Sequence, residues 1–146
     1  MKIRNRNIVL VAAMAIAMLS FTALPGGEFY RITVNGKQVI EQFLTKSQET
    51  PTLHINAFGS NDKLSVYYNH CGKMGTNRVI TLKSSERIQK TWKFNAASGD
   101  QMTINLKELS AVAKGSESYQ LVYSSNELAK SRVLANVRIG GATASN

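Results

Sequence analysis

The residue types with the clearest potential for chemistry stand together in residues 69–75, NHCGKMG. This stretch holds the only cysteine, Cys71, directly after His70 and three residues before Met74. Thiolate and thioether sulfurs are soft ligands that suit Cu(I), and imidazole suits copper and zinc. Together with the second histidine of the chain, His54, these side chains form a candidate soft-metal site.

The spacing of these residues favours a turn over a metal site. No histidine follows Cys71, although a blue-copper site takes two histidines, one cysteine and a weak axial methionine, ordinarily with a histidine after the cysteine. Adjacent residues of an extended strand point to opposite faces, so His70 and Cys71 meet at one ion only if the strand has already turned. Zinc is disfavoured because a structural zinc site takes four Cys or His ligands and the chain has three such residues. We predict no cofactor and keep copper as the alternative.

The residues needed for catalysis are also sparse. A Cys–His nucleophile needs an imidazole that accepts the thiol proton and a third group that orients the imidazole, and no motif places these together. The only aspartates, Asp62 and Asp100, lie in turn-like segments and are better explained as turn formers than as paired catalytic carboxylates. No glycine motif of a phosphate-binding loop is present. The sequence therefore predicts a protein that is not an enzyme.

The N-terminal segment has the layout of a secretory signal. Lys2, Arg4 and Arg6 precede the apolar run of residues 8–24, as a positive n-region precedes an apolar h-region. We interpret residues 1–27 as a signal peptide and expect export to the periplasm, the cell surface or the outside. A retained membrane anchor is the alternative, because 17 apolar residues lie at the lower end of the roughly 17 to 25 that span a bilayer. Only in that case would the chain contact a membrane.

The remaining residues have the size of one domain, predicted at 28–139 with a disordered tail at 140–146. Residues 1–27 contain three of the 18 Lys and Arg and none of the nine Asp and Glu, so the rest carries 15 basic and nine acidic residues, a net charge of +6. No run of Lys or Arg concentrates that charge, so we expect no specific binding of nucleic acid. A single cysteine cannot form an intrachain disulfide, and a hydrophobic core must therefore hold the domain.

After residue 27 the chain shows short alternating segments separated by turn residues every eight to twelve positions, which is typical of β-sandwiches and barrels. Residues 29–34 and 37–44 flank Asn35-Gly36, which is a strong hairpin signal because both residues tolerate positive φ. In residues 64–71 the two-residue period places Leu64, Val66, Tyr68 and His70 on one face, which we predict to face the core.

The complete pattern predicts an all-β fold, a single antiparallel β-sandwich of about eight strands, with a small β-barrel as the alternative. Residues 106–114 are expected to form one or two helical turns that end at Gly115. The further predicted strands are residues 52–55, 78–84, 87–94, 101–106, 119–125 and 132–139.

Two of these strands carry the candidate binding surface. Arg78, Lys83, Arg87 and Lys93 are predicted on the outer face of neighbouring strands, where basic and polar side chains could contact a partner. The alternative is that this face is exposed to solvent and binds no partner.

The order of LSVYYNHCG, a glycine-rich turn, RVITLKS, IQKTWKF and MTINLKEL resembles small exported β-rich proteins of uncharacterised function from Bacteroidetes-type bacteria. The resemblance implies an envelope or secreted location and supplies no activity or functional residue. We therefore expect an exported, non-enzymatic β-sandwich domain that binds protein or glycan in the cell envelope. The alternative is a soft-metal or thiol function centred on Cys71.

Overall fold

The computed structural model describes residues 27–45, 48–56, 58–85, 87–113 and 118–140. All of the predicted signal segment except Gly27, and the tail beyond Gly140, lie outside the described residues. Within the described ranges no helix combines the length and the apolar composition needed to cross a bilayer. The elements are β1 (Phe29–Val34), β2 (Lys37–Phe43), β3 (Thr52–Ile55), β4 (Lys63–Asn69), β5 (Arg78–Ser84), β6 (Arg87–Phe94), η2 (Ala96–Ser98), β7 (Gln101–Asn105), α2 (Leu106–Val112), β8 (Tyr119–Ser124) and β9 (Arg132–Ile139).

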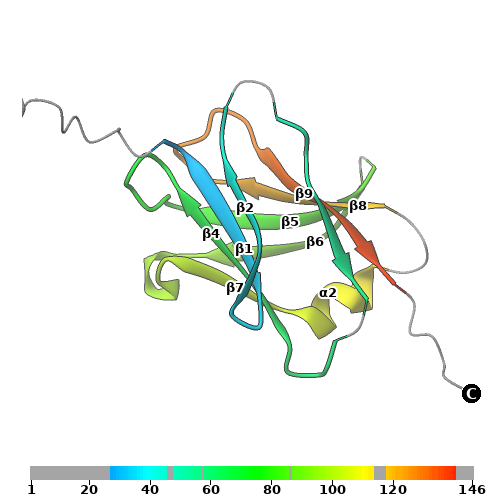
Figure 1. The fold of residues 1–146 in the computed structure, drawn as a ribbon. Helices are drawn as coiled ribbons and strands as arrows, with labels where there is room; N and C mark the ends of the chain where they lie inside the picture. The colour runs from blue at the N-terminus through cyan, green and yellow to red at the C-terminus, as the bar shows by residue number, and fades with distance from the viewer. Residues whose placement is uncertain (1–26, 46–47, 57, 86, 114–117, 141–146) are drawn as a thin grey trace, which may run out of the picture.

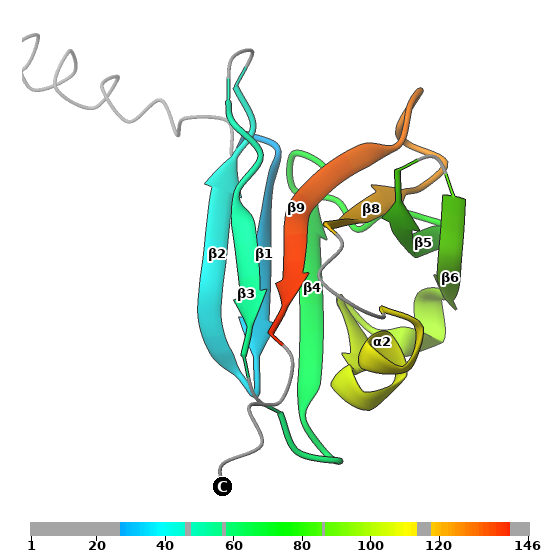
Figure 2. The same ribbon diagram turned by 90° about the vertical axis from the view of Figure 1, so that its right-hand side faces the viewer.

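The strands form two sheets that pack face to face (Figures 1 and 2). One sheet has the order β2-β1-β4-β7 and the other has the order β3-β9-β8-β5-β6. Neither sheet closes into a barrel, so the predicted β-sandwich is confirmed. Strand β3 is the exception to antiparallel pairing among the described neighbours, because it pairs parallel to β9. The chain reaches that position by leaving β2 and crossing to the second sheet before it returns as β4.

The first hairpin forms where the Asn35-Gly36 pair predicts it. Asn35 has φ of 50° and Gly36 has φ of 78°, and two positive φ angles match the twist of the flanking strands. The side-chain oxygen of Asn35 also accepts a hydrogen bond from the backbone N–H of Lys63 at 2.9 Å. This bond ties the hairpin to the start of β4.

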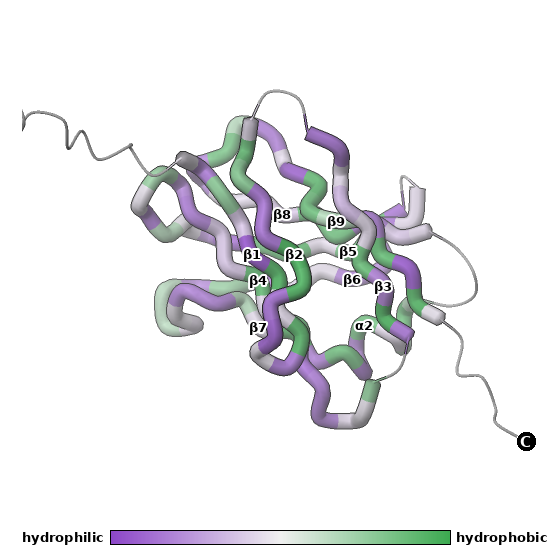
Figure 3. The backbone as a smooth tube through the Cα atoms, viewed as in Figure 1, coloured by the Kyte–Doolittle hydropathy of each residue, from purple (hydrophilic) through white to green (hydrophobic). Residues whose placement is uncertain are grey.

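The core lies between the sheets and follows the two-residue period of the strands. In β4 the side chains of Leu64, Val66 and Tyr68 are buried, whereas Ser65 and Tyr67 on the other face are half-buried. Figure 3 shows this period as a repeated change between green and purple along the strands. Each fully buried Leu or Val contributes about 1.5 to 3 kcal/mol. The predicted core face of this strand is therefore confirmed.

The predicted helix also forms, and it covers one end of the sandwich (Figure 2). Asn105 caps it, since its side-chain oxygen accepts a hydrogen bond from the backbone N–H of Lys107 at 2.8 Å. Leu106 and Leu109 are its buried residues. The predicted stop at Gly115 falls outside the described residues.

The opposite end is assembled from strand termini of both sheets. Here β1, β5, β7 and β9 begin and β2, β4, β6 and β8 end, as the antiparallel pairings require. Glu28 directly precedes β1 at this end, and we name it the Glu28 end. Residues 70–77 and residues 125–131, which follow β4 and β8, also lie there.

Candidate functional site

His70 is the centre of a polar cluster at the Glu28 end. Its Nε2 atom lies 2.9 Å from the phenol oxygen of Tyr123 and 3.3 Å from the hydroxyl of Ser125. Its Nδ1 atom lies 3.8 Å from a carboxylate oxygen of Glu28. Burial lowers the pKa of His70, while the carboxylates of Glu127 and Glu28 oppose that shift. The imidazole therefore favours its neutral form and links residues of both sheets.

Glu28 connects this histidine to a tyrosine and an arginine. The hydroxyl of Tyr68 donates a 2.5 Å hydrogen bond to one carboxylate oxygen of Glu28, and Nη2 of Arg132 lies 3.6 Å from the other. Burial raises the pKa of the Tyr68 phenol, and the bond to Glu28 raises it further. Tyr68 also stacks on Tyr123 with ring centroids 4.2 Å apart. The carboxylate of Glu28 is thus oriented by a phenol that stays protonated.

Glu127 fixes residues 70–77 against this cluster. Both of its carboxylate oxygens lie 2.9 Å from the backbone nitrogen of Thr76, and one accepts a 2.7 Å bond from the Thr76 hydroxyl. Burial raises the pKa of Glu127, but hydrogen bonds from Thr76 and from other groups outweigh this effect and lower the pKa to about 2. The backbone of Gly75 packs closely against this cluster, and a Cβ atom on Gly75 would lie 2.5 Å from the Tyr123 hydroxyl.

The NHCGKMG stretch consequently forms a turn. Strand β4 ends at Asn69, and the side-chain oxygen of Asn69 accepts a hydrogen bond from the backbone N–H of Gly72 at 2.9 Å. Cys71 has φ of 52° and an exposed side chain, and Met74 is also exposed. Cys71 therefore lies past the end of the strand, in the turn.

The four candidate soft-metal ligands are not brought together by one element. His54 lies in β3, on the free edge of the other sheet, whereas the other three candidates lie after β4. The imidazole of His70 already contacts the Tyr123 hydroxyl. Among the described residues no group of three or more His, Cys, Asp or Glu side chains could hold a metal ion.

The predicted surface position of Arg78 is wrong. Arg78 is 1% exposed, and its guanidinium donates hydrogen bonds to the carbonyl oxygens of Asp100 (3.1 Å), Asn95 (2.9 Å) and Gly99 (2.7 Å). It shares the inward face of β5 with Ile80, which is also buried. Arg78 is therefore a structural residue that holds the β6–β7 connection.

The other basic candidates do lie on neighbouring strands, because β5 pairs with β6. Lys83 is half-buried, and Arg87 and Lys93 are exposed. A bulge between Leu82 and Lys83 changes the register, so Lys83 pairs with Ile88. Ile88 is 64% exposed for this reason, although in a strand without a bulge the two-residue period would place it on the same face as Trp92 and Phe94.

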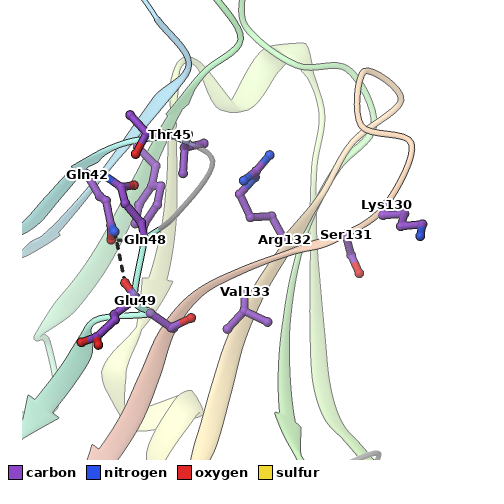
Figure 4. Close-up of a pocket in the computed structure, with 11 residues that line it drawn as sticks. Gln42, Thr45, Gln48, Glu49, Lys130, Ser131, Arg132 and Val133 are labelled. Carbon is purple, nitrogen blue, oxygen red and sulfur yellow. Dashed lines mark hydrogen bonds between the residues drawn. The ribbon is translucent and has the colours of Figure 1, made fainter.

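A hollow at the Glu28 end is a concave feature that sequence reasoning missed. It has a volume of about 440 Å³ and lies between the end of β2 with the following residues and the start of β9 (Figure 4). We name it the Arg132 hollow. Only two of its eleven lining residues are apolar, and the rest carry phenol, hydroxyl, amide or charged groups. The lining residues are Tyr30, Gln42, Leu44, Thr45, Gln48, Glu49, Thr50, Lys130, Ser131, Arg132 and Val133.

Tyr30 and Gln42 give one wall of the hollow a fixed geometry. The Tyr30 hydroxyl lies 2.8 Å from the side-chain oxygen of Gln42 and 2.6 Å from the carbonyl oxygen of Leu134. The amide nitrogen of Gln42 donates to the carbonyl oxygen of Glu49 at 3.2 Å. Burial raises the pKa of Tyr30 to about 12, although Arg132 opposes the shift. The phenol therefore stays protonated and holds this wall in place.

Arg132 is a residue of the hollow with an unsatisfied buried donor. Its Nε atom is buried and has no hydrogen-bond partner among the described residues. Its side chain as a whole is 38% exposed and points between the two walls in Figure 4. Because Nε has almost no accessible surface, a ligand in the hollow would contact the exposed part of this side chain.

The residues of this end carried no sequence pattern that could have revealed them. His70 and Tyr123 are 53 positions apart, and the Tyr30 hydroxyl meets a carbonyl 104 positions away. Only the inward face of β4 pointed to part of the cluster, because it placed Tyr68 and His70 together.

No protein-family model, no curated protein and no solved structure matches this chain. The functional interpretation below is therefore built from the geometry of the Glu28 end.

Proposed function

We propose that the chain is an exported, non-enzymatic β-sandwich module that binds glycan or protein in the cell envelope, with the ligand seated in the Arg132 hollow. The observation that carries this proposal is the lining of the hollow, which is polar over nine of its eleven residues. Its volume of about 440 Å³ falls in the range of small-ligand sites, about 300 to 1,000 Å³. The basic N-terminal residues followed by an apolar run support the exported location.

A glycan fits this lining better than a protein surface does. Sugar hydroxyls donate and accept hydrogen bonds, and the amides of Gln42 and Gln48 and the hydroxyls of Thr50 and Ser131 can do the same. A stable protein interface instead needs an apolar or aromatic anchor and roughly 1,000 Å² of buried surface. The polar lining supplies few such anchors, so glycan is the favoured ligand class.

The proposal is tested by blocking the hollow. Full-length protein, purified in mild detergent, is screened against an array of envelope and extracellular glycans and against envelope protein extracts. Ser131→Trp places an indole in the hollow, whereas Ser98→Trp places the same side chain in the exposed η2 turn. We expect glycan binding that is lost in the first variant and kept in the second. Equal binding by the two variants, or no ligand in either screen, would refute the proposal.

A second proposal, a soft-metal or thiol function, has one supporting observation. Cys71 and Met74 are both exposed in the same turn, so their sulfurs are accessible to Cu(I). Titration of the reduced protein with Cu(I), with Cys71→Ser and Met74→Leu as variants, tests it. Stoichiometric binding that is lost in both variants would favour this function over glycan binding.

A further inference from the structure

We propose that the Arg132 hollow selects a carboxylated sugar, such as a hexuronic or sialic acid residue, whose carboxylate pairs with the Arg132 guanidinium. This inference rests on the glycan-binding function proposed above and names the ligand class of the same site. It starts from Arg132, a partly exposed lining side chain whose guanidinium has few partners among the described residues.

The guanidinium has an incomplete set of partners. Nη2 lies 3.6 Å from Glu28, which is longer than a hydrogen bond of 2.7 to 3.2 Å. Glu28 cannot easily turn toward it, because its other oxygen accepts the 2.5 Å bond from Tyr68. Nε has no partner at all among the described residues. The guanidinium also interacts with the Tyr68 phenol. The Arg132 side chain is 38% exposed, and its exposed part remains available to an acceptor from outside the chain.

The geometry of a guanidinium favours a carboxylate as that acceptor. Its N–H groups form a planar fork, and a carboxylate can accept two parallel hydrogen bonds from two of these N–H groups with its two oxygens. Such a pair is bidentate and charge-assisted, so it is stronger than a bond from a neutral sugar hydroxyl. A lysine at this position could not provide the same fork.

The charges around the hollow favour a single negative charge on the ligand. Arg132 and Lys130 are cationic, and Glu49 lines the same hollow while Glu28 lies behind Arg132. Two positive and two negative groups leave little excess positive charge for a doubly charged phosphate monoester. A carboxylate adds only one charge, and the hydroxyls of the same sugar can bond to the wall that contains Gln42.

The test compares sugars that differ only in the carboxylate. Oligosaccharides of galacturonic, glucuronic and sialic acid, each paired with its methyl ester, are titrated by calorimetry into the full-length chain in mild detergent. We expect the acids to bind at least about tenfold more tightly than the esters. Arg132→Gln should abolish that preference, and Arg132→Lys should reduce it. Arg138→Gln, an exposed position on the same strand, should leave it unchanged.

The possible outcomes separate this inference from the function on which it rests. Esters that bind as tightly as the acids would overturn the carboxylate assignment, as would an unchanged preference in both Arg132 variants. Binding of neutral glycans alone would overturn it too, while the glycan-binding function would stand. Binding of no glycan would overturn both. Thermal unfolding of each variant shows that a lost preference does not come from a lost fold.

Discussion

The Nε2 atom of His70 lies 2.9 Å from the phenol oxygen of Tyr123, and this contact joins the residue after β4 to a strand of the opposite sheet. Gly75 packs directly against the pair, since a Cβ on Gly75 would lie 2.8 Å from the His70 nitrogen. The stretch that holds the only cysteine is therefore anchored to the sandwich by its histidine and its second glycine. Cys71 stands exposed beside that anchor.

Gly75→Ala should destabilise the protein by about 1 to 3 kcal/mol, as overpacking of a filled site does. The added methyl group would lie 2.5 Å from the Tyr123 hydroxyl, 2.8 Å from His70 and 3.0 Å from Glu127. These groups bond to one another or to the same turn, so none can move without loss of a contact. Urea unfolding followed by tryptophan fluorescence measures the change in the free energy of unfolding.

Gly59→Ala is the matched control for that variant. A Cβ on Gly59 would meet its nearest neighbour, Asp62, at 3.7 Å, which is an ordinary contact. The same chemical change should therefore be neutral here, or stabilising by about 0.4 to 1 kcal/mol through the unfolded chain. If the two variants lose equal stability, close packing at Gly75 is not the cause.

His70 should make stability depend on pH below about 6.5. Burial holds its folded-state pKa below the ordinary value of 6.5, against the opposing carboxylates of Glu127 and Glu28 and with the help of Arg132. The unfolded chain therefore binds the proton more tightly. The stability contributed by neutral His70 is complete above pH 6.5 and is lost as the pH falls through the folded-state pKa.

Substitution of His70 by glutamine should flatten that part of the pH profile. Urea unfolding of wild type and His70→Gln at several values from about pH 7.5 to about pH 5 provides the comparison. NMR titration of the folded protein gives the pKa of the imidazole directly. A folded-state pKa above 6.5 would show that the carboxylates outweigh burial.

At lower pH, Glu127 should make the larger contribution to the pH dependence of stability. Its pKa is about 2 in the folded protein and 4.5 ordinarily, so its contribution is complete above pH 4.5 and is lost as the pH falls toward 2. Glu127→Gln removes the charge from the bonds to Thr76 and should cost about 1 kcal/mol at neutral pH, since the residue is exposed. Glu49→Gln is the control. Acid unfolding curves that are identical for wild type and Glu127→Gln would contradict the assignment.

The fold was predictable to the extent that it depends on local periodicity. The Asn35-Gly36 hairpin and the inward face of β4 follow from neighbours in the chain, and both are confirmed. The inward position of Arg78 was present in the same period, since it precedes Ile80 by two residues. This buried position was not predicted because arginine is rarely buried unless it has partners. The partners of Arg78 are carbonyl oxygens of a connection that is distant in sequence.

The bulge and the Glu28 end were not predictable for a different reason. A bulge shifts the register by one residue, which moves Ile88 to the outer face without any change in the composition of the strand. The Glu28 end depends on which strand termini meet in space. The parallel placement of β3 beside β9 likewise has no signal in the neighbouring sequence. Arg132 and Glu28 come together because the start of β9 and the residue before β1 meet at this end.

Cys71 should react with a thiol reagent in the native protein. Its side chain is exposed and lies past the end of β4, so access does not require unfolding. We expect the absorbance change with a disulfide reagent to reach the same final value with and without denaturant. Cys71→Ser should give no signal. Labelling that occurs only in denaturant would show that the turn is closed over the thiol in solution.

Arg78→Met should be the most damaging substitution of a basic residue on β5 and β6. The change removes three charge-assisted hydrogen bonds and leaves the carbonyl oxygens of Asn95, Gly99 and Asp100 without that donor. The expected loss is about 3 to 5 kcal/mol in the free energy of unfolding, measured by urea denaturation. Arg87→Met, at the exposed start of β6, should change it by less than about 0.5 kcal/mol. Similar small changes in both variants would mean that the buried guanidinium does not hold the β6–β7 connection.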